Sequence, residues 1–599
     1  MTTTDASPWI ARGATGLLAA FNEAGVLHAA DVRVAQRVGV LGGETDERVL
    51  LAVASAVRAV RLGSVGADLA ALPASIGATE TELPWPDPDD WVAAVVASPL
   101  TAAQVIHHDQ GLVYLDRYHR LECEVAEILR DRVAAPPPVV VEDVLAASLE
   151  RVGGPHLSEE QAAAVEQSVR RRTLVLTGGP GTGKTTTVAR MVYALAQQHA
   201  AGADGHLRPF SVALAAPTGK AATRLQEAVA AELAGLGITA DELSPPHART
   251  IHRLLGWRPD NTTRFVHDRG NRLGHDLVVV DEASMVDLTL MARLLEAVRP
   301  DSRLILVGDP QQLTSVGAGA VLSDLVAGFE GRADSPVCAL RTNHRSTEDI
   351  KALAAALRAG DADAVLAVLR SGSAEVEYDE TDDPESVLRE RCVAAARAVR
   401  EAATSDAPAA DRAAAADEAL QEFRLLCAHR EGPAGVRLWN QHIEQWLAEE
   451  TGQPLGGRWY PGRPLLVTAN DYALDIYNGE TGVVVVDEGR PRVWISGARQ
   501  RTLAPSRLDA VETMHAMTIH KSQGSQAAEI AVLLPDADSR LLSRELFYTA
   551  VTRAQRKVRV VGTEAAVRAA VATTAQRATG LRGRLSEPNQ DPPYPVSGR

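Results

Sequence analysis

The stretch from Thr177 to Thr187 has the residue types and spacing of a polyphosphate site. A glycine is followed by four residues and then by Gly183, Lys184 and Thr185, between an apolar run and a helical pattern. Glycines let backbone N–H groups close around phosphates, and the following helix N-terminus favours an anion. We expect Lys184 to neutralise the β- and γ-phosphates and the Thr185 hydroxyl to hold Mg²⁺.

Gln161 lies just upstream of this loop, in a stretch that opens a helix. Ser158 is the expected N-cap and Gln161 occupies the third helical position, which is the pattern of a capping box. Because the helix precedes the phosphate loop, the Gln161 amide could instead form hydrogen bonds with an adenine edge. The sequence does not favour either the capping box or the adenine contact. The residues expected to contact the nucleotide are Gln161, Gly178, Gly179, Pro180, Gly181, Thr182, Gly183, Lys184, Thr185 and Thr186.

Two later strands deliver polar side chains that suit hydrolysis. The apolar run 277–280 ends in Asp281 and Glu282, where Asp281 can bind Mg²⁺ and Glu282 can orient or deprotonate water. An acidic pair after a strand is often a helix N-cap, but its place after a phosphate loop favours catalysis. The next strand, 304–307, leads to Gln312, whose amide suits the γ-phosphate or the attacking water.

The chain holds only five lysines among 61 basic residues, so its lysines are expected where a compact ammonium is needed. Lys220 follows the strand 212–216, at a position where open α/β sheets bind ligands. The alternative for Lys220 is an ordinary surface lysine after a turn. Segments 249–253 and 517–524 are also dense in hydroxyl, imidazole and cationic groups that suit phosphate.

Composition limits the class of protein. The 599 residues are too many for one core, and the net charge of −16 means that nucleic acid must be bound by a locally basic channel. The four cysteines form no C-x-x-C pair, which argues against a zinc site. No apolar run reaches spanning length and no leader pattern is present, so we expect a cytoplasmic protein without a membrane partner.

An ordered series of motifs carries a family resemblance. GGPGTGKTT, APTGKAATRL, ARTIHRLLG, VVVDEASM, LVGDPQQL, TNHRS, TIHKSQGSQ and LFYTAVTRA resemble superfamily 1 helicases from about residue 157 to 565. The chain is most similar to the RecD branch, and within it to subunits of RecBCD helicase-nuclease complexes. NDYALDIYNGETG, residues 470–482, is similar to that branch's β-barrel insertion.

The resemblance implies an α/β fold with two RecA-like P-loop NTPase domains, a small SH3-like β-barrel insertion and a helical N-terminal domain. ATP would bind between the RecA-like domains and single-stranded DNA would cross their tops. The expected segments are a partner-docking domain at 1–110, a connecting helix and linker at 111–156, RecA-like domain 1 at 157–345, RecA-like domain 2 at 346–428 and 511–575, the insertion at 429–510 and a disordered tail at 576–599.

The resemblance also assigns roles to residues. Lys184, Asp281, Glu282 and Gln312 would act on ATP, and Arg345 and Arg553 would be arginine fingers. An arginine after the helical stretch 546–552 suits this role, because it can reach a γ-phosphate across a cleft. The expected contacts to DNA phosphates are Thr218, Lys220, Thr250, His252, Thr518, His520 and Lys521.

The function implied is an ATP- and Mg²⁺-dependent 5′ to 3′ DNA helicase that serves as a motor subunit. RecB-like and RecC-like partners would complete a heterotrimer that processes double-strand DNA ends. We find no compact Asp/Glu/Lys cluster outside the ATP motifs. The resemblance implies that the nuclease site lies on a partner, the large beta subunit of such complexes. The rivals are a stand-alone RecD-like helicase, an RNA helicase and a catalytically silent scaffold.

Overall fold

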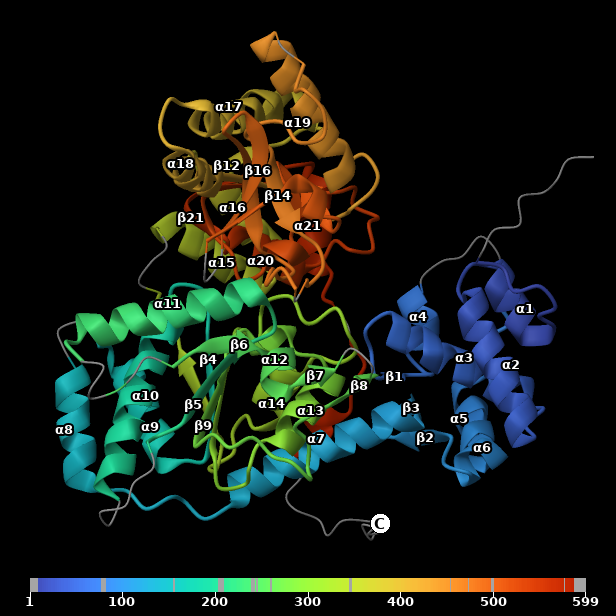
Figure 1. Cartoon of the computed structure of the whole chain (residues 1–599). Helices are drawn as coiled ribbons and strands as arrows, with labels where there is room; N and C mark the ends of the chain where they lie inside the picture. The colour runs from blue at the N-terminus through green and yellow to red at the C-terminus, as the bar shows by residue number, and fades with distance from the viewer. Residues whose placement is uncertain are drawn as a thin grey trace, which may run out of the picture.

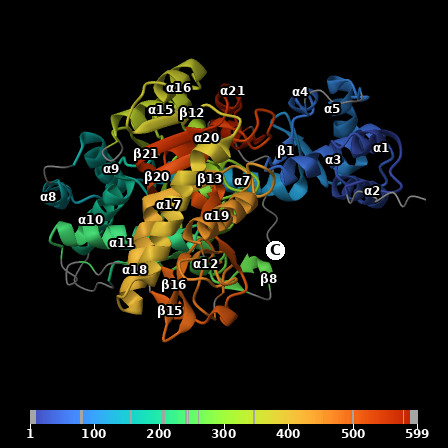
Figure 2. The same cartoon turned by 90° about the horizontal axis from the view of Figure 1, so that it is seen from above.

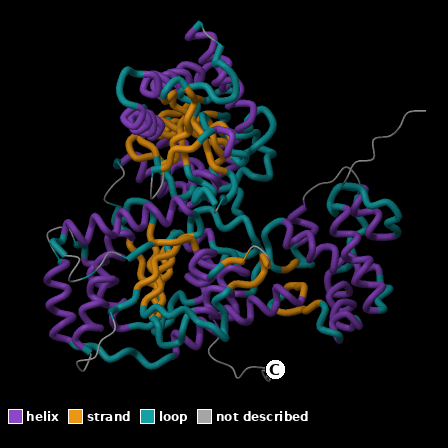
Figure 3. The backbone as a smooth tube through the Cα atoms, viewed as in Figure 1, coloured by secondary structure: helices purple, strands orange, loops and turns teal. Residues whose placement is uncertain are grey.

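The computed structural model shows two stacked α/β units and a smaller unit beside the lower one (Figure 1). It describes residues 9–586 apart from 77–81, 154–156, 203–208, 239–242, 244–245, 259–260, 344–346, 453, 472, 497–499 and 576. The strands form a separate sheet at the centre of each stacked unit (Figure 3). This arrangement agrees with the two α/β domains expected from the sequence.

The lower unit is built on a six-stranded parallel sheet in the order β11-β4-β10-β9-β5-β6. Its four central strands are short apolar runs that are largely buried, as expected for the interior of a parallel sheet, whereas the two edge strands are more exposed. They are β4 (Thr173–Gly178), β5 (Val212–Ala216), β6 (Ala248–Thr250), β9 (Leu277–Val280), β10 (Arg303–Gly308) and β11 (Val337–Leu340). β4 lies between β10 and β11, so the phosphate loop starts from the interior of the sheet.

Helices cover both faces of this sheet, and neighbouring strand residues alternate between the two cores. Leu174 and Leu176 pack into one core while Val175 packs into the other. The helices of the first face are α8 (Glu142–Val152), α9 (Glu159–Arg170), α10 (Lys184–Ala201) and α11 (Gly219–Gly235). Those of the second are α7 (Asp116–Ala134), α12 (Ile251–Leu255), α13 (Leu288–Ala297) and α14 (Val321–Gly328), with η1 (Ala283–Met285) and the strand pair β7 (Trp257–Arg258) and β8 (Asn261–Phe265) nearby.

The upper unit is built on a five-stranded parallel sheet in the order β12-β21-β20-β13-β19. The strands are β12 (Val376–Asp379), β13 (Phe423–Cys427), β19 (Ala516–Thr518), β20 (Ala527–Leu533) and β21 (Ala554–Val561). One core includes α15 (Glu348–Ala359), α16 (Ala362–Leu369), α18 (Ala409–Glu422), α20 (Arg544–Val551) and α21 (Glu564–Ala572). The other core includes α17 (Pro384–Thr404) and α19 (Val436–Thr451).

An antiparallel sheet in the order β17-β16-β15-β14-β18 is inserted before β19. It contains β14 (Pro464–Val467), β15 (Thr481–Asp487), β16 (Arg490–Ser496), β17 (Arg501–Leu503) and β18 (Val511–Thr513), with η2 (Pro505–Arg507). The sheet therefore spans 464–513, whereas the sequence predicted 429–510. The difference arises because α19 packs on the second parallel sheet and β18 pairs with β14.

A tight hairpin connects β15 to β16 in this sheet. Asp487 and Arg490 face each other across a two-residue turn in which Glu488 and Gly489 both have positive φ. Gly479, near the end of the long loop between β14 and β15, also has positive φ.

The unit beside the lower domain contains strands that the sequence did not reveal. Its helices are α1 (Gly16–Glu23), α2 (Ala29–Gly42), α3 (Glu47–Arg61), α4 (Leu72–Ile76), α5 (Pro88–Ala97) and α6 (Pro99–Ala102). A three-stranded sheet of β1 (Gly66–Ala67), β2 (Ile106–Asp109) and β3 (Leu112–Leu115) closes it. The predicted boundary at 110 falls inside the β2–β3 hairpin, and the unit ends where α7 begins. Figure 2 shows α1 to α5 and β1 of this unit beside the two α/β units.

The prediction of a disordered tail at 576–599 is wrong for residues 577–586. This segment returns from the upper unit to the lower one and ends in α22 (Leu581–Ser586), whose Leu581 and Leu585 are buried against α7 and α14. Buried Glu122 accepts hydrogen bonds from Thr579, Gly580 and Arg584. Residues 587–599 lie outside the described part.

No helix in the described ranges is both long and apolar enough to cross a membrane.

Candidate active site

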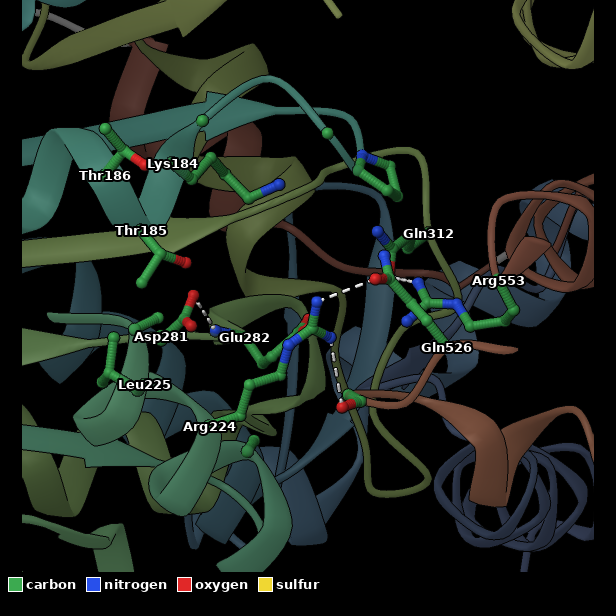
Figure 4. A pocket seen from close by; sticks show the side chains of 16 residues that line it. Lys184, Thr185, Thr186, Arg224, Leu225, Asp281, Glu282, Gln312, Gln526 and Arg553 are labelled. Atoms are coloured by element: carbon green, nitrogen blue, oxygen red, sulfur yellow. Dashed lines mark hydrogen bonds between the residues drawn. The ribbon is translucent and has the colours of Figure 1, made fainter. Parts of the chain in front are cut away.

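A cavity of about 150 Å³ lies between the two parallel sheets and collects most of the predicted catalytic residues (Figure 4). Each sheet contributes residues from the carboxyl ends of its strands, as ligand sites in parallel α/β sheets do. The lining residues are Pro180, Gly181, Gly183, Lys184, Thr185, Thr186, Ala221, Arg224, Leu225, Ala228, Asp281, Glu282, Gln312, Gly524, Gln526 and Arg553.

The phosphate loop has the geometry that its glycines predict. Gly181 and Gly183 have φ of 82° and 81°, in the left-handed region that favours glycine. A Cβ at Gly178 would lie 2.8 Å from the Leu340 carbonyl oxygen, and one at Gly183 would lie 2.3 Å from the Gln161 side chain. Lys184 Nζ donates to the Gly178 and Gly179 carbonyls at 2.6 and 3.0 Å, so the ammonium reaches across the loop. This cradle fits a polyphosphate.

The capping box at Gln161 is confirmed. Gln161 N–H donates to Ser158 Oγ at 3.3 Å, and Ser158 N–H donates to Gln161 Oε1 at 3.2 Å. Gln161 Nε2 donates in turn to the Thr182 carbonyl at 3.2 Å, which ties the helix start to the phosphate loop. The amide therefore supports the loop, and an adenine contact by Gln161 stays a prediction.

Asp281 and Glu282 stand at the end of β9, where the expected catalytic carboxylates belong. Burial and the adjacent charge of Glu282 raise the pKa of the Asp281 carboxyl above its ordinary value. Glu282 has φ of 51°, an unusual conformation for a non-glycine residue that costs on the order of 1 kcal/mol. Such strain is characteristic of functional positions.

Thr185 and Asp281 line the same cavity, and their oxygens form a donor set that suits Mg²⁺. The raised pKa of Asp281 means that its charge lacks sufficient compensation from the protein. A cation beside this carboxylate would supply that compensation, so these residues fit the expected metal.

A hydrogen-bond network joins the two domains across the cavity. Arg553 Nη2 donates to Gln312 Oε1 at 2.6 Å, and Gln312 Nε2 donates to Asp309 Oδ2 at 3.1 Å. Tyr548 OH donates to the same Asp309 oxygen at 3.1 Å and lies against Gly179 of the phosphate loop. All four of these side chains are buried. Arg553 thus faces the phosphate loop from the opposite domain.

Several residues of this site were missed from the sequence. Arg224 lines the cavity and donates to Gln526 Oε1 at 2.9 Å, from helix α11 to the loop before β20. Both residues stand inside quoted motifs, and Arg224 lies one helical turn after Lys220, which was the available signal. Tyr548 and Asp309 also lie inside motifs without an assigned role. The second predicted finger, Arg345, lies outside the described residues.

The predicted DNA-contact threonines share one position, the end of a strand that leads into a helix. Thr218 and Thr250 are the N-caps of α11 and α12, where their hydroxyls accept from Ala221 and Arg253 N–H groups. Thr518 accepts from Lys521 N–H at 3.3 Å, at the start of η3 (His520–Ser522). Short strand-to-helix turns expose N–H groups that suit phosphate oxygens.

The predicted DNA-contact cations and imidazoles are partly withdrawn from water. Burial and the charge of Arg424 lower the pKa of Lys220 to about 8. Burial also lowers the pKa of His252 and His520, the latter with help from the charge of Arg577. Lys521 Nζ pairs with Glu512 at 2.7 Å. An anion that approaches these groups would raise the pKa of Lys220 and would compete with Glu512 for Lys521.

Comparisons with known proteins agree with this geometry. Residues 161–318 match the family described as AAA domain, and residues 513–561 match the UvrD-like helicase C-terminal domain. The chain is 56% identical over 576 residues to the RecBCD enzyme subunit RecD of Mycobacterium tuberculosis, which covers 96% of this chain and 97% of that protein.

Two further proteins are more distant. The chain is 32% identical over 495 residues to the ATP-dependent RecD2 DNA helicase of Deinococcus radiodurans, covering 82% of this chain but 60% of that protein. A solved structure of Pif1 helicase from Bacteroides in complex with ADP-AlF3 and ssDNA matches with a TM-score of 0.38 and 18% identity. That match covers 67% of this chain and 92% of the Pif1 chain.

Proposed function

The chain belongs to the RecD family of superfamily 1 helicases, and we propose that it is the ATP-driven 5′ to 3′ DNA motor of a RecBCD-type complex. The relative that supports this role most strongly bears the name of a RecBCD subunit and has nearly the same length. RecB-like and RecC-like chains are the proposed partners, and the proposed setting is the processing of double-strand DNA ends in the cytoplasm.

One observation carries the proposal of ATP hydrolysis: Arg553 of one domain bonds Gln312 of the other beside the phosphate loop. In the proposed reaction, Lys184 and Arg553 hold the γ-phosphate from opposite sides of the cleft. Glu282 accepts a proton from the attacking water, and Gln312 senses the phosphate. Thr185 and Asp281 would hold Mg²⁺, which when bound screens the phosphate charge.

Translocation is proposed to follow from the domain arrangement. Thr218 and Thr250 stand on the first sheet and Thr518 on the second, so a strand bound to both sets bridges the cleft. Closure around ATP would then shorten the distance between the two sets of contacts, and opening would lengthen it. Phosphate contacts of this type position a strand without reading its sequence.

Two parts of the fold are assigned more finely by this proposal. We assign the antiparallel sheet at 464–513 as the SH3-like β-barrel insertion, supported by its own buried core. We assign the N-terminal helices as the partner-docking domain, supported by exposed apolar side chains on α2 at Val34, Val40 and Leu41. Nuclease activity is proposed to belong to a partner chain.

The rival proposal is a stand-alone RecD-like helicase. The chain is 56% identical to the RecBCD subunit but 32% identical to the RecD2 helicase, which favours the subunit. The proposal is tested by measuring ATP turnover of the lone chain with and without single-stranded DNA. We expect DNA to stimulate turnover, and Lys184→Gln to abolish it without unfolding the protein. Turnover at the wild-type rate in Lys184→Gln would remove the phosphate loop from the mechanism.

A further inference from the structure

The guanidinium of Arg577 donates hydrogen bonds to several backbone carbonyls of the loop that follows Gln312. Arg577 Nη1 donates to the Gly317 and Gly319 carbonyls, the latter at 3.4 Å, and Arg577 Nη2 donates to the Ser315 carbonyl. Carbonyls that lie two residues apart thus converge on a single side chain. The planar fork of arginine provides the several donors that this arrangement requires.

The same loop is held by the second domain at its other end. Leu313 N–H donates to Thr549 Oγ1 at 2.9 Å, and the Leu313 carbonyl accepts from Gln523 Nε2 at 2.9 Å. Thr549 stands on α20, four residues before Arg553, and Gln523 follows the predicted DNA-contact residue Lys521. The loop that follows Gln312 is therefore held at both ends. Thr549 and Gln523 of the second domain hold its start, and Arg577, which follows the second domain in sequence, holds its end.

Arg577 also reaches the N-terminal unit. Arg577 Nη1 donates to the Gly63 carbonyl at 3.2 Å, and the same carbonyl accepts from Gly319 N–H at 2.9 Å. The neighbouring residue Ala578 completes the junction, because its carbonyl accepts from Val65 N–H at 2.9 Å and its N–H donates to Ser64 Oγ at 3.1 Å. Three regions distant in sequence thus meet at one arginine.

The surroundings of Arg577 connect it to one predicted DNA contact and to the start of α13. Burial and the charge of Arg577 lower the pKa of His520, a predicted DNA-contact residue. Burial lowers the pKa of Arg577 itself, and the charge of Asp287, the N-cap of α13, opposes that shift. Asp287 lies against Gly317, where a Cβ would approach Asp287 Oδ2 to 2.3 Å, so the loop fits closely at this point. The segment that bears Arg577 is itself anchored to α7 through Glu122.

We propose that Arg577 is a positioning residue that couples DNA binding to ATP turnover, by holding residues 313–319 in register with the N-terminal turn at 63–65. The inference rests on the proposed helicase function. When the second domain moves, it pulls on the loop through the two hydrogen bonds of Leu313. Arg577 holds the other end of the loop in place, so the motion changes the position of Gln312. Without Arg577 the ATP-binding residues stay in place, but DNA binding no longer alters the position of Gln312.

The test compares ATP turnover with and without single-stranded DNA in the full-length chain. The variants are Arg577→Ala, Arg577→Lys and the control Arg582→Ala, an exposed arginine of the same segment. We expect Arg577→Ala to lower the DNA-stimulated kcat by about tenfold while basal turnover and the KM for ATP stay unchanged. Arg577→Lys is expected to be intermediate, because an ammonium cannot span the same carbonyls. Arg582→Ala should match the wild type.

The outcomes separate the two proposals. If DNA stimulates the wild type and Arg577→Ala alike, the coupling role is overturned while the helicase proposal stands. An equal loss of basal and stimulated turnover in both Arg577 variants, with a lower melting temperature, also overturns it in favour of a purely structural role. If DNA does not stimulate the wild type, the proposed function fails and takes this inference with it.

Discussion

Arg553 Nη2 donates to Gln312 Oε1 at 2.6 Å, which joins a guanidinium from the second parallel sheet to an amide from the first. Both side chains are 3% exposed, and burial lowers the pKa of Arg553 from its ordinary value. The interaction therefore lies in a dry cleft where a charged group acts strongly on a phosphate.

Replacing Arg553 tests whether this guanidinium acts on the reacting phosphate. We expect Arg553→Ala to lower kcat for ATP hydrolysis by about a thousandfold, because a charge facing the transition state is lost. The KM for ATP should change little, since Lys184 and the loop N–H groups stay in place. Steady-state ATPase kinetics measure both values. Arg556→Ala is the matched control, because Arg556 is exposed and pairs with Glu422 at the surface. Comparable losses in the two variants would contradict the assignment.

Asp281 offers a prediction about stability and pH. Burial raises its pKa in the folded chain, so the folded state holds the proton more readily than the unfolded state. The contribution of this carboxyl to stability is therefore highest at low pH and falls as the pH rises through the interval between the two pKa values. Without Mg²⁺, Asp281→Asn should raise the free energy of unfolding at pH 8 by on the order of 1 kcal/mol while abolishing ATP turnover.

Urea denaturation at pH 8 and pH 5 measures this effect. The gain from Asp281→Asn should be smaller at pH 5, and Mg²⁺ should stabilise the wild type more than the variant. A variant that is less stable than the wild type at pH 8 would show that the carboxylate is well compensated by the protein.

A comparison of ATP with GTP as substrates distinguishes the two interpretations of Gln161, which are support of the phosphate loop and contact with adenine. Because its amide holds Ser158 and Thr182, we expect Gln161→Ala to raise the KM for ATP and for GTP by the same factor. An adenine contact would instead weaken ATP alone, since guanine presents a different edge. Turnover assays with the two nucleotides measure this ratio, and a loss confined to ATP would favour the adenine interpretation.

The C-terminal segment supplies a stability prediction. Glu122 is fully buried and accepts hydrogen bonds from Tyr114, Thr579, Gly580 and Arg584. Glu122→Ala should lower the free energy of unfolding by about 3 kcal/mol, because it removes the acceptor of four hydrogen bonds and leaves Arg584 paired only with the partly exposed Asp109. Glu127→Ala, an exposed change on the same helix, is the control. Chemical denaturation that finds the two variants equally stable would mean that the segment is not anchored through Glu122.

The sequence predicted most of the residues that gather around the cavity, because the geometry of their motifs is local. The run 174–176, the glycines and Lys184 occupy one strand, one turn and one helix start, and strand ends at Asp281 and Gln312 follow from the parallel sheet. The geometry of such motifs is set by residues that are adjacent in sequence, so the sequence pattern alone predicts it.

The remaining features depend on distant contacts. Residues 577–586 are rich in glycine and arginine, and their two anchors, Leu581 and Leu585, pack against helices more than 250 residues away in sequence. The strand β1 has only two residues and is stabilised by pairing with β3. Arg224 lines a cavity whose other side is formed by second-domain residues such as Gln526 and Arg553, about 300 residues later in the sequence. No periodicity within these segments carries that information.

Strand polarity of unwinding is the most direct test of the central claim, that this chain is an ATP-driven 5′ to 3′ DNA motor. The measurement compares unwinding of duplexes with a 5′ or a 3′ single-stranded tail by the chain co-purified with its partner subunits, using wild type and Lys184→Gln. We predict that the wild-type chain contributes unwinding from the 5′ tail and that Lys184→Gln removes it. Unwinding from the 5′ tail that persists in Lys184→Gln would contradict the account.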